Sequence, residues 1–261
     1  PARALNAARM PAWVETSSPN FVARYDEVDG RDVRGVLDLL EQARERLGGV
    51  FPRLPDDVGV VLHTSRLELD LSQPVLPVVR RLTTPAARRY LAGWAERDTL
   101  HVLAPRLLAA RAANVDGSRE MLELTPAALY VQLVVGCCNR ELPPPWTPRS
   151  TVRAARWAWL LAGAAQWFSG QTALARPVIA RRLRDDARPD FPPRLRDAAL
   201  LGGSVVDLVA REQGTAAAVR LACSPLPRGG PRQALLEAFD GRALVHTEGT
   251  WRGHLSRLAG H

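Results

Sequence analysis

The chain of 261 residues, with 46% hydrophobic and 24% charged residues, has the composition of a folded globular protein, which excludes a disordered or fibrous one. All 35 of its basic residues are arginine, and the formal net charge is +8. Because the arginines run from Arg3 to Arg257 at solvent-facing helical spacings near Asp or Glu, they indicate a solvated surface and argue against a nucleic-acid partner.

The cysteines and the hydropathy of the chain bound its class further. Cys137, Cys138 and Cys223 are too few for a disulfide framework, so we expect buried thiols. We expect no transmembrane segment and no signal peptide within the sequence. Its localisation stays open between the cytoplasm and, if an upstream signal or anchor was removed before Pro1, an extracytoplasmic compartment.

The first part of the chain alternates strand and helix patterns. Apolar runs predict strands at residues 21–25, 58–64 and 99–103. Apolar positions at helical spacing predict a helix over residues 32–47, with Asp32 as its N-cap and a glycine pair, Gly48 and Gly49, at its end. Two shorter helices are expected over residues 74–82 and 85–95.

The strand patterns stop after about residue 115, and helical patterns follow. Thr125 and Pro126 are a typical helix start, and residues 127–138 are apolar on every side, which predicts a buried helix. A proline-rich connection leads to a second buried helix over residues 151–170. Further helices are expected at residues 174–184, 196–213, 215–223, 231–239 and 246–259.

These patterns predict an α+β fold in one compact unit. Residues 1–20 are expected to be an N-terminal extension. Residues 21–115 are expected to form a small α/β lobe with a mixed sheet, and residues 116–261 a predominantly helical lobe.

The second buried helix carries a pattern that points to a family. Residues 159–170 read WLLAGAAQWFSG. They resemble the third-ligand helix of the peptidase MA-like gluzincins, which are thermolysin-like zinc metallopeptidases and read roughly Trp-Leu-x-Glu-Gly-x-Ala, then an aromatic residue and Ser-Gly. The positions match except that Ala162 stands in place of the Glu.

Other segments resemble the same family in order and spacing. Residues 21–64 are similar to its opening strand, helix and strand, and residues 200–214 (LLGGSVVDLVAREQG) to the helix after the Glu helix. Residues 248–252 read EGTWR, which is similar to its closing Glu-x-x-Trp-Arg pattern. The resemblance covers most of the chain from about residue 13 and implies a zincin-like architecture.

The residues that hold zinc in this family are missing here. Its first buried helix carries His-Glu-x-x-His, and zinc needs three protein ligands and an open position for water. The corresponding pentad is VGCCN, with Val135, Gly136 and Asn139 at the key positions, and a shift by one residue gives VVGCC. The helix that usually supplies a Tyr or His to the transition state has Ala199, Leu200 and Leu201 near its start, so we expect that role to be lost as well. The resemblance therefore implies a pseudopeptidase with no metal and no cofactor.

A surviving groove would make the chain a binding module for a peptide or a protein partner. Asn139 and Gln166 are the polar residues placed to face such a groove on the two buried helices. His101 is a third candidate, because its strand corresponds to the sheet edge that borders the substrate groove in the family.

Two alternatives stay open. The first is a hydrolase with a relocated site that uses Cys137, Cys138 or His101, although the cysteines lie in an apolar helix that favours inert thiols. The second is an arginine-rich module that binds nucleic acid or an anionic surface, which requires the arginines to gather on one face.

Overall fold

A computed structural model describes residues 12–185 and 188–260 and shows a mixed α+β fold. The strands of its sheet are β1 (Trp13–Ser17), β2 (Phe21–Asp26), β3 (Val58–His63), β4 (Gly93–Ala95) and β5 (Thr99–Leu103). Their order is β1-β2-β3-β5-β4. The three inner strands are parallel, and β1 and β4 pair antiparallel with their neighbours at the two edges.

The structure confirms the three strands expected from apolar runs and adds two short edge strands. β1 lies in the stretch expected as an N-terminal extension, of which residues 1–11 lie outside the described residues. β4 lies at the end of the helix expected over residues 85–95, of which only α4 (Pro85–Arg88) forms. Three residues are too few to show a strand period, and β4 forms because it pairs with β5, four residues further along the chain.

The remaining helices of the first part are α1 (Gly30–Gly48), α2 (Arg66–Ser72), α3 (Val75–Leu82) and α5 (Pro105–Ala109), with a short 3₁₀ helix at Glu27–Asp29 before α1. α1 packs on β2, and α2 packs on β3 and β5. Gly49 ends α1 as expected, but Asp32 lies in its first turn. The side chain that caps this corner is Asp26, which accepts a hydrogen bond from Val28 N ahead of the 3₁₀ helix.

The regular elements of the second part are all helices within its described residues. They are α6 (Ser118–Glu123), α7 (Thr125–Cys138), α8 (Pro148–Arg156), α9 (Ala158–Ser169), α10 (Gln171–Leu174), α11 (Arg176–Asp185), α12 (Leu195–Gln213), α13 (Thr215–Cys223), α14 (Pro231–Ala238) and α15 (Leu244–Leu258). The second part opens with α6, which packs on α5 and α7. The single helix expected over residues 151–170 is two helices that meet at Trp157. This change of direction lets the amphipathic α8 lie on the surface while α9, apolar on every side, enters the core.

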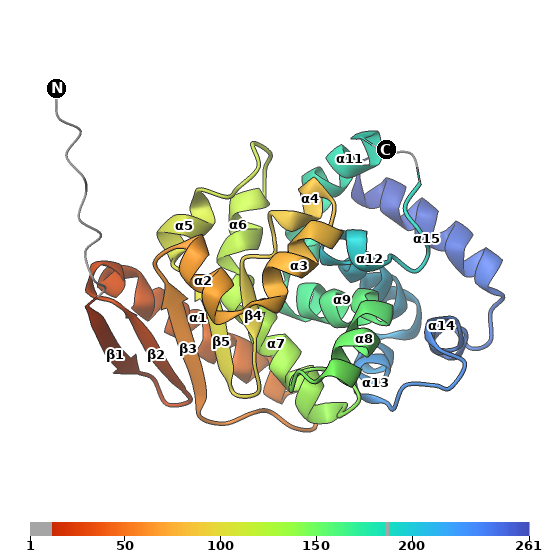
Figure 1. Ribbon diagram of the computed structural model, residues 1–261. Coiled ribbons are helices and arrows are strands. Elements are labelled where there is room, and N and C mark those ends of the chain that lie inside the picture. Colours follow the sequence, from red (N-terminus) through yellow and green to blue (C-terminus); the bar gives the residue numbers. More distant parts are fainter. Residues whose placement is uncertain (1–11, 186–187, 261) are drawn as a thin grey trace.

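Three helices hold the two parts together. α7 packs on β4, β5 and α1, and on its other side it packs on α9, which packs on α12 (Figure 1). α9 and α12 approach closely because two glycines face each other: a Cβ at Gly163 would lie 2.5 Å from Gly202 O. The core is therefore continuous from the sheet into the helical part.

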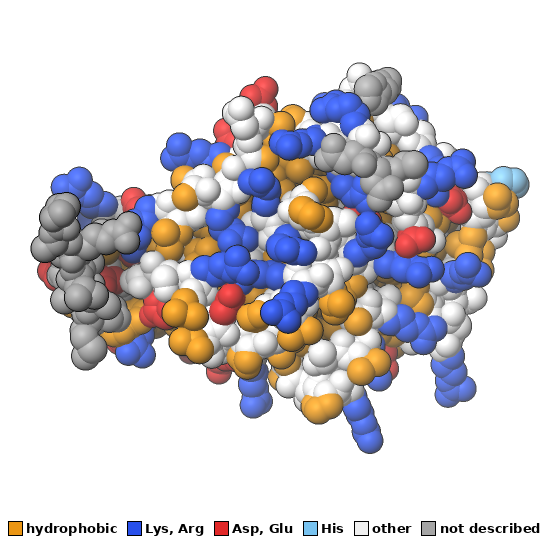
Figure 2. Space-filling view, turned by 45° about the horizontal axis from the view of Figure 1, so that its top comes forward, with side chains coloured by type: hydrophobic (Ala, Val, Ile, Leu, Met, Phe, Trp, Pro, Cys, Tyr) orange, Lys and Arg blue, Asp and Glu red, His pale blue; other side chains and the backbone are white. Residues whose placement is uncertain are grey.

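The surface and the hydropathy of the helices complete the description. Arginines are spread widely over the face drawn in Figure 2, with apolar side chains between them. No helix within the described part of the chain combines the length and the apolar character needed to cross a membrane.

Candidate functional site

An apolar cavity of about 210 Å³ lies where the edge of the sheet meets the helical part. α7 contributes Gln132 to its wall, and α9 contributes Leu161 and Ala162. The remaining walls come from α3, β4, α8 and the start of α12, including Val75, Val78, Val79, Leu82, Trp94, Ala154, Ala155, Leu195, Ala198 and Ala199. Its polar side chains are few and uncharged: Gln132, Thr83 and Thr151.

Trp146 closes one side of this cavity. Its indole ring stacks on Trp94 of β4, with ring centroids 4.3 Å apart, and its Nε1 donates a hydrogen bond of 2.7 Å to Ala95 O. In the antiparallel ladder of β4 with β5, Ala92 O accepts a hydrogen bond from Leu103 N, and Glu96 N donates one to Thr99 O. Because residues along such a strand bond alternately to one side and the other, the backbone N–H and C=O groups of Gly93 and Ala95 point away from β5. Trp146 therefore satisfies part of the outer edge of the sheet.

The resemblance predicted four positions of a lost metal site, and the structure brings only Ala162 into the cavity. Val135 is fully buried in the core, and a Cβ at Gly136 would lie 2.5 Å from Pro144 O. Asn139 donates to Ser224 O at 2.7 Å and accepts from Glu141 N at 3.1 Å. The residue of α7 that shares the cavity with Ala162 is Gln132, about one turn before Val135.

Gln166 joins two helices instead of facing an open groove. Its side chain is buried, its Oε1 accepts from Gly203 N at 2.8 Å, and its Nε2 donates to Ala198 O at 3.2 Å. Both partners belong to α12, so Gln166 links α9 to α12. The position of Gln166 on the second buried helix was predicted from the sequence. Its hydrogen bonds to the backbone of α12 were not predicted.

His101 lies against a second histidine. Its Nδ1 is 3.0 Å from Nε2 of His63, and the rings stack with centroids 5.3 Å apart. Carboxylates stand at both ends, with Glu68 Oε1 3.9 Å from His63 Nδ1 and Glu96 Oε2 3.6 Å from His101 Nε2. The strand of His101 is not the sheet edge that we expected, because β4 covers it on that side.

Burial keeps both imidazoles neutral at pH 7. It lowers the pKa of His63 to about 4, and the neighbouring His101 adds to this effect. Burial also lowers the pKa of His101, against the opposing influence of Glu96. When both imidazoles are neutral, one ring can donate its N–H to the bare nitrogen of the other across the 3.0 Å between His63 Nε2 and His101 Nδ1. His101 stands directly opposite Trp94 in the ladder but does not line the cavity.

The cysteines do not have the setting of a nucleophile. All three are half-buried free thiols. Burial raises the pKa of Cys137, and burial together with the neighbouring Cys138 raises the pKa of Cys223 to about 12. A reactive cysteine needs a lowered thiol pKa, whereas those of Cys137 and Cys223 are raised. These pKa shifts argue against the hydrolase with a cysteine nucleophile.

The residues around Ala162 do not fit the zinc ion that the family would imply. Zinc is held by His, Cys, Asp or Glu, and the cavity wall has none of them. Nowhere in residues 12–185 and 188–260 do three or more such side chains come together in a group that could hold a metal.

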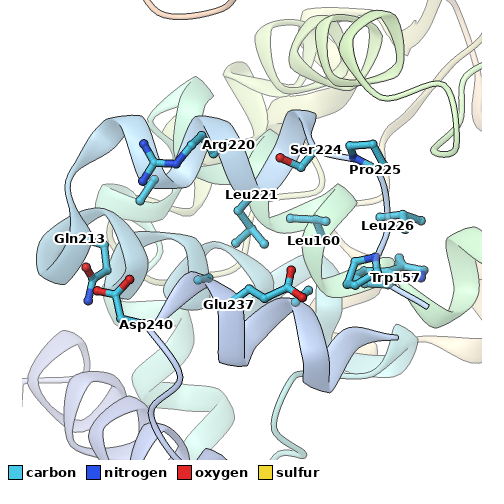
Figure 3. Close-up of a pocket in the computed structure, with 14 residues that line it drawn as sticks. Trp157, Leu160, Gln213, Arg220, Leu221, Ser224, Pro225, Leu226, Glu237 and Asp240 are labelled. Atoms are coloured by element: carbon cyan, nitrogen blue, oxygen red, sulfur yellow. The ribbon is translucent and has the colours of Figure 1, made fainter. Parts of the chain in front are cut away.

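A second cavity of about 200 Å³ lies between α9, α12, α13 and α14 (Figure 3). Gln213 and Asp240 lie toward one end, and Trp157 and Leu226 lie toward the other. Glu237 also lines it, but its carboxylate already accepts a hydrogen bond from Gln233 at 2.8 Å. This cavity combines an apolar end with a polar one and suggests no catalytic group.

Comparison with protein-family models, with curated proteins and with solved structures found no match to this chain. The proposals below therefore depend on the residues and the geometry described above.

Proposed function

We propose that the chain is a non-catalytic, peptide-binding relative of the zincin-like peptidases, in which an apolar cavity stands where the metal site would be. One observation carries this proposal. Ala162, which the resemblance compares with the third-ligand Glu, lines one cavity together with Gln132 of the first buried helix and Ala199 near the start of the following helix. The three helices that the resemblance compares with the metal-binding, third-ligand and following helices of the family thus border the same cavity.

Under this proposal the missing metal-binding pentad would be aligned in a register different from VGCCN. With Gln132 as its last position, the pentad reads ALYVQ, and Ala128 and Gln132 take the places of the two histidines at i and i+4. Leu129 then takes the place of the catalytic Glu. This register supplies no metal ligand and no general base, which supports a binding role without hydrolysis.

The chemistry of the cavity favours an apolar side chain as its ligand. Its wall is almost entirely aliphatic and aromatic, and Val78 and Leu82 at its rim are each 56% exposed. Burying one large aliphatic or aromatic side chain there would contribute about 1.5–3 kcal/mol, with further burial from neighbouring residues on α3. The expected partner is a peptide segment anchored by one such side chain.

A panel of capped hexapeptides that differ only in one central residue tests this proposal. Peptides with Leu or Phe at that position are expected to bind, and those with Ser or Asp are not, as measured by isothermal titration calorimetry. Ala162→Leu fills the cavity and should weaken binding at least about tenfold, or 1.4 kcal/mol. The matched control Ala216→Leu lies on the exposed surface of α13 and should bind like the wild type.

Two results would contradict the proposal. One is equal affinity for all four peptides, and the other is unchanged binding by a folded Ala162→Leu variant. The same peptides should remain intact after prolonged incubation with the protein, as checked by mass spectrometry, and specific cleavage would overturn the non-catalytic part.

A further inference from the structure

A basic pocket of about 750 Å³ lies on the helical part and adjoins the apolar cavity, with which it shares Ala155 and Leu195. The end of α8, Trp159 of α9, the segment 188–195, the start of α14 and the middle of α15 surround it. Seven charged side chains line it, five arginines and two carboxylates: Arg156, Arg188, Arg194, Arg232, Arg252, Asp190 and Glu248.

The two carboxylates are already paired. Arg194 Nε lies 3.3 Å from Asp190 Oδ2, and a contact of 2.6 Å joins Arg252 to Glu248. No carboxylate of the described residues forms an ion pair with the other three arginines, Arg156, Arg188 and Arg232. Three positive charges without a counter-charge therefore border one hollow, which favours a negatively charged ligand there.

Backbone and indole donors point to the same ligand chemistry. α12 begins at Leu195 and α14 begins at Pro231, both residues line the pocket, and neither helix has a side-chain cap. The free N–H groups and the dipole at a helix N-terminus attract anions. Trp159 also lines the pocket, and its Nε1 is buried without a hydrogen-bond partner.

Gly230 lets one arginine reach this position. A Cβ at Gly230 would overlap the guanidinium group of Arg156, and the residue has a φ of +79°, which favours glycine. The missing side chain therefore allows Arg156 of α8 to pack over the turn before α14. Arg252 donates to Pro189 O at 3.2 Å, which holds the segment 188–195 against α15.

We propose that this pocket binds a compact, multiply charged anion, namely a phosphate ester or a polyphosphate. Guanidinium groups bind phosphate oxygens in pairs through two parallel N–H donors, and several arginines around one hollow match a group with several charged oxygens. The site adjoins the proposed peptide cavity but differs from it in chemistry, because its arginines do not line that cavity.

The shape and composition of the surface argue against a nucleic acid as the ligand. Single strands bind to positively charged grooves with exposed aromatic platforms. The aromatic side chains that line this pocket are not exposed platforms, because Trp159 is buried and Phe191 is half-buried against Trp251. Figure 2 shows arginines spread over a broad face. The three arginines of the pocket without a carboxylate partner, Arg156, Arg188 and Arg232, border a concave site instead.

Calorimetric titration with pyrophosphate, inorganic phosphate and a short DNA duplex tests the proposal. Pyrophosphate is expected to bind more tightly than phosphate. The double variant Arg156→Gln/Arg232→Gln should lose at least about tenfold in pyrophosphate affinity. The control Arg34→Gln/Arg46→Gln makes the same change of net charge on the exposed face of α1 and should bind like the wild type.

The remaining outcomes would overturn the proposal. Equal weakening in both double variants would mean that pyrophosphate responds only to net charge. Tighter binding of the duplex than of pyrophosphate, lost in the pocket variant, would assign the site to nucleic acid. Thermal unfolding of both double variants checks their fold, and if the pocket variant is unfolded, Arg232→Gln alone replaces it, with Arg34→Gln as its control.

Discussion

His63 and His101 stand on neighbouring parallel strands with Nε2 and Nδ1 3.0 Å apart. Because Val61 and not His63 is the direct partner of His101 in the ladder, the two rings meet diagonally on one face of the sheet. Glu68 and Glu96 lie beyond the two ends of the pair, and Gln73 donates to Glu96 at 3.0 Å. A neutral hydrogen-bonded pair in this position makes the stability of the sheet sensitive to acid.

We expect His63 to destabilise the protein as the pH falls from about 6.5 to about 4. The folded-state pKa of about 4 is below the usual 6.5, so the unfolded chain takes up a proton first and stability is lost over this range. The loss attributable to His63 is at most about 3 kcal/mol. Urea unfolding at several pH values should show a weaker dependence for His63→Gln than for the wild type. His246→Gln, at an exposed histidine, should leave the dependence unchanged.

Gly163→Ala should destabilise the protein, although alanine is the better helix former. Its Cβ would meet Gly202 O at 2.5 Å, and overpacking of this kind costs about 1–3 kcal/mol. Gly35→Ala is the matched control in an exposed helix, because nothing lies within 4 Å of its Cβ position, and it should stabilise α1 by up to about 1 kcal/mol. Urea unfolding measures both changes. A neutral or stabilising Gly163→Ala would contradict the close contact of α9 and α12.

Asp197→Ala should destabilise the protein by about 3–5 kcal/mol, because it removes one partner of a buried ion pair. Asp197 accepts from Arg182 Nε at 2.9 Å and from Thr84 Oγ1 at 3.2 Å, and both members of the ion pair are buried. Glu123→Ala breaks an exposed pair with Arg119 and should have no measurable effect on stability. Similar chemical denaturation midpoints for the two variants would show that burial does not strengthen the Asp197 pair.

Trp146→Phe should keep the stack on Trp94 but remove the hydrogen bond to Ala95 O, at a cost of about 1 kcal/mol. Trp146→Ala removes the stack as well and should destabilise the protein more. Trp13→Phe on β1 is the control, since the indole nitrogen of Trp13 has no hydrogen bond within the described part of the chain. Equal unfolding midpoints for Trp146→Phe and the wild type would show that the indole does not support the edge of the sheet.

Elements with long apolar patterns could be predicted from the sequence, because a run of apolar residues indicates a buried strand or helix whatever packs against it. The strands at residues 58–63 and 99–103 and the two buried helices belong to this group. The edge strand β4 and the break at Trp157 could not be predicted, because a three-residue strand depends on its partner and the break depends on what packs around it. The mixed α+β class is confirmed, and the zincin-like architecture stays a proposal.

The candidate site divides in the same way. The sequence by itself determined that residues 125–139 contain no His or Glu and that residue 162 is Ala, since residue identity suffices for that. Only the tertiary structure decided that Gln132 and Ala162 line the same cavity. It also decided that the side chains of Asn139 and Gln166 form hydrogen bonds with backbone groups inside the fold. The same holds for the arginines from distant segments that border one pocket. Contacts between residues far apart in the sequence depend on how the helices cross and on which backbone N–H and C=O groups are free to bond a side chain. The spacing of residues within one helix or strand gives neither.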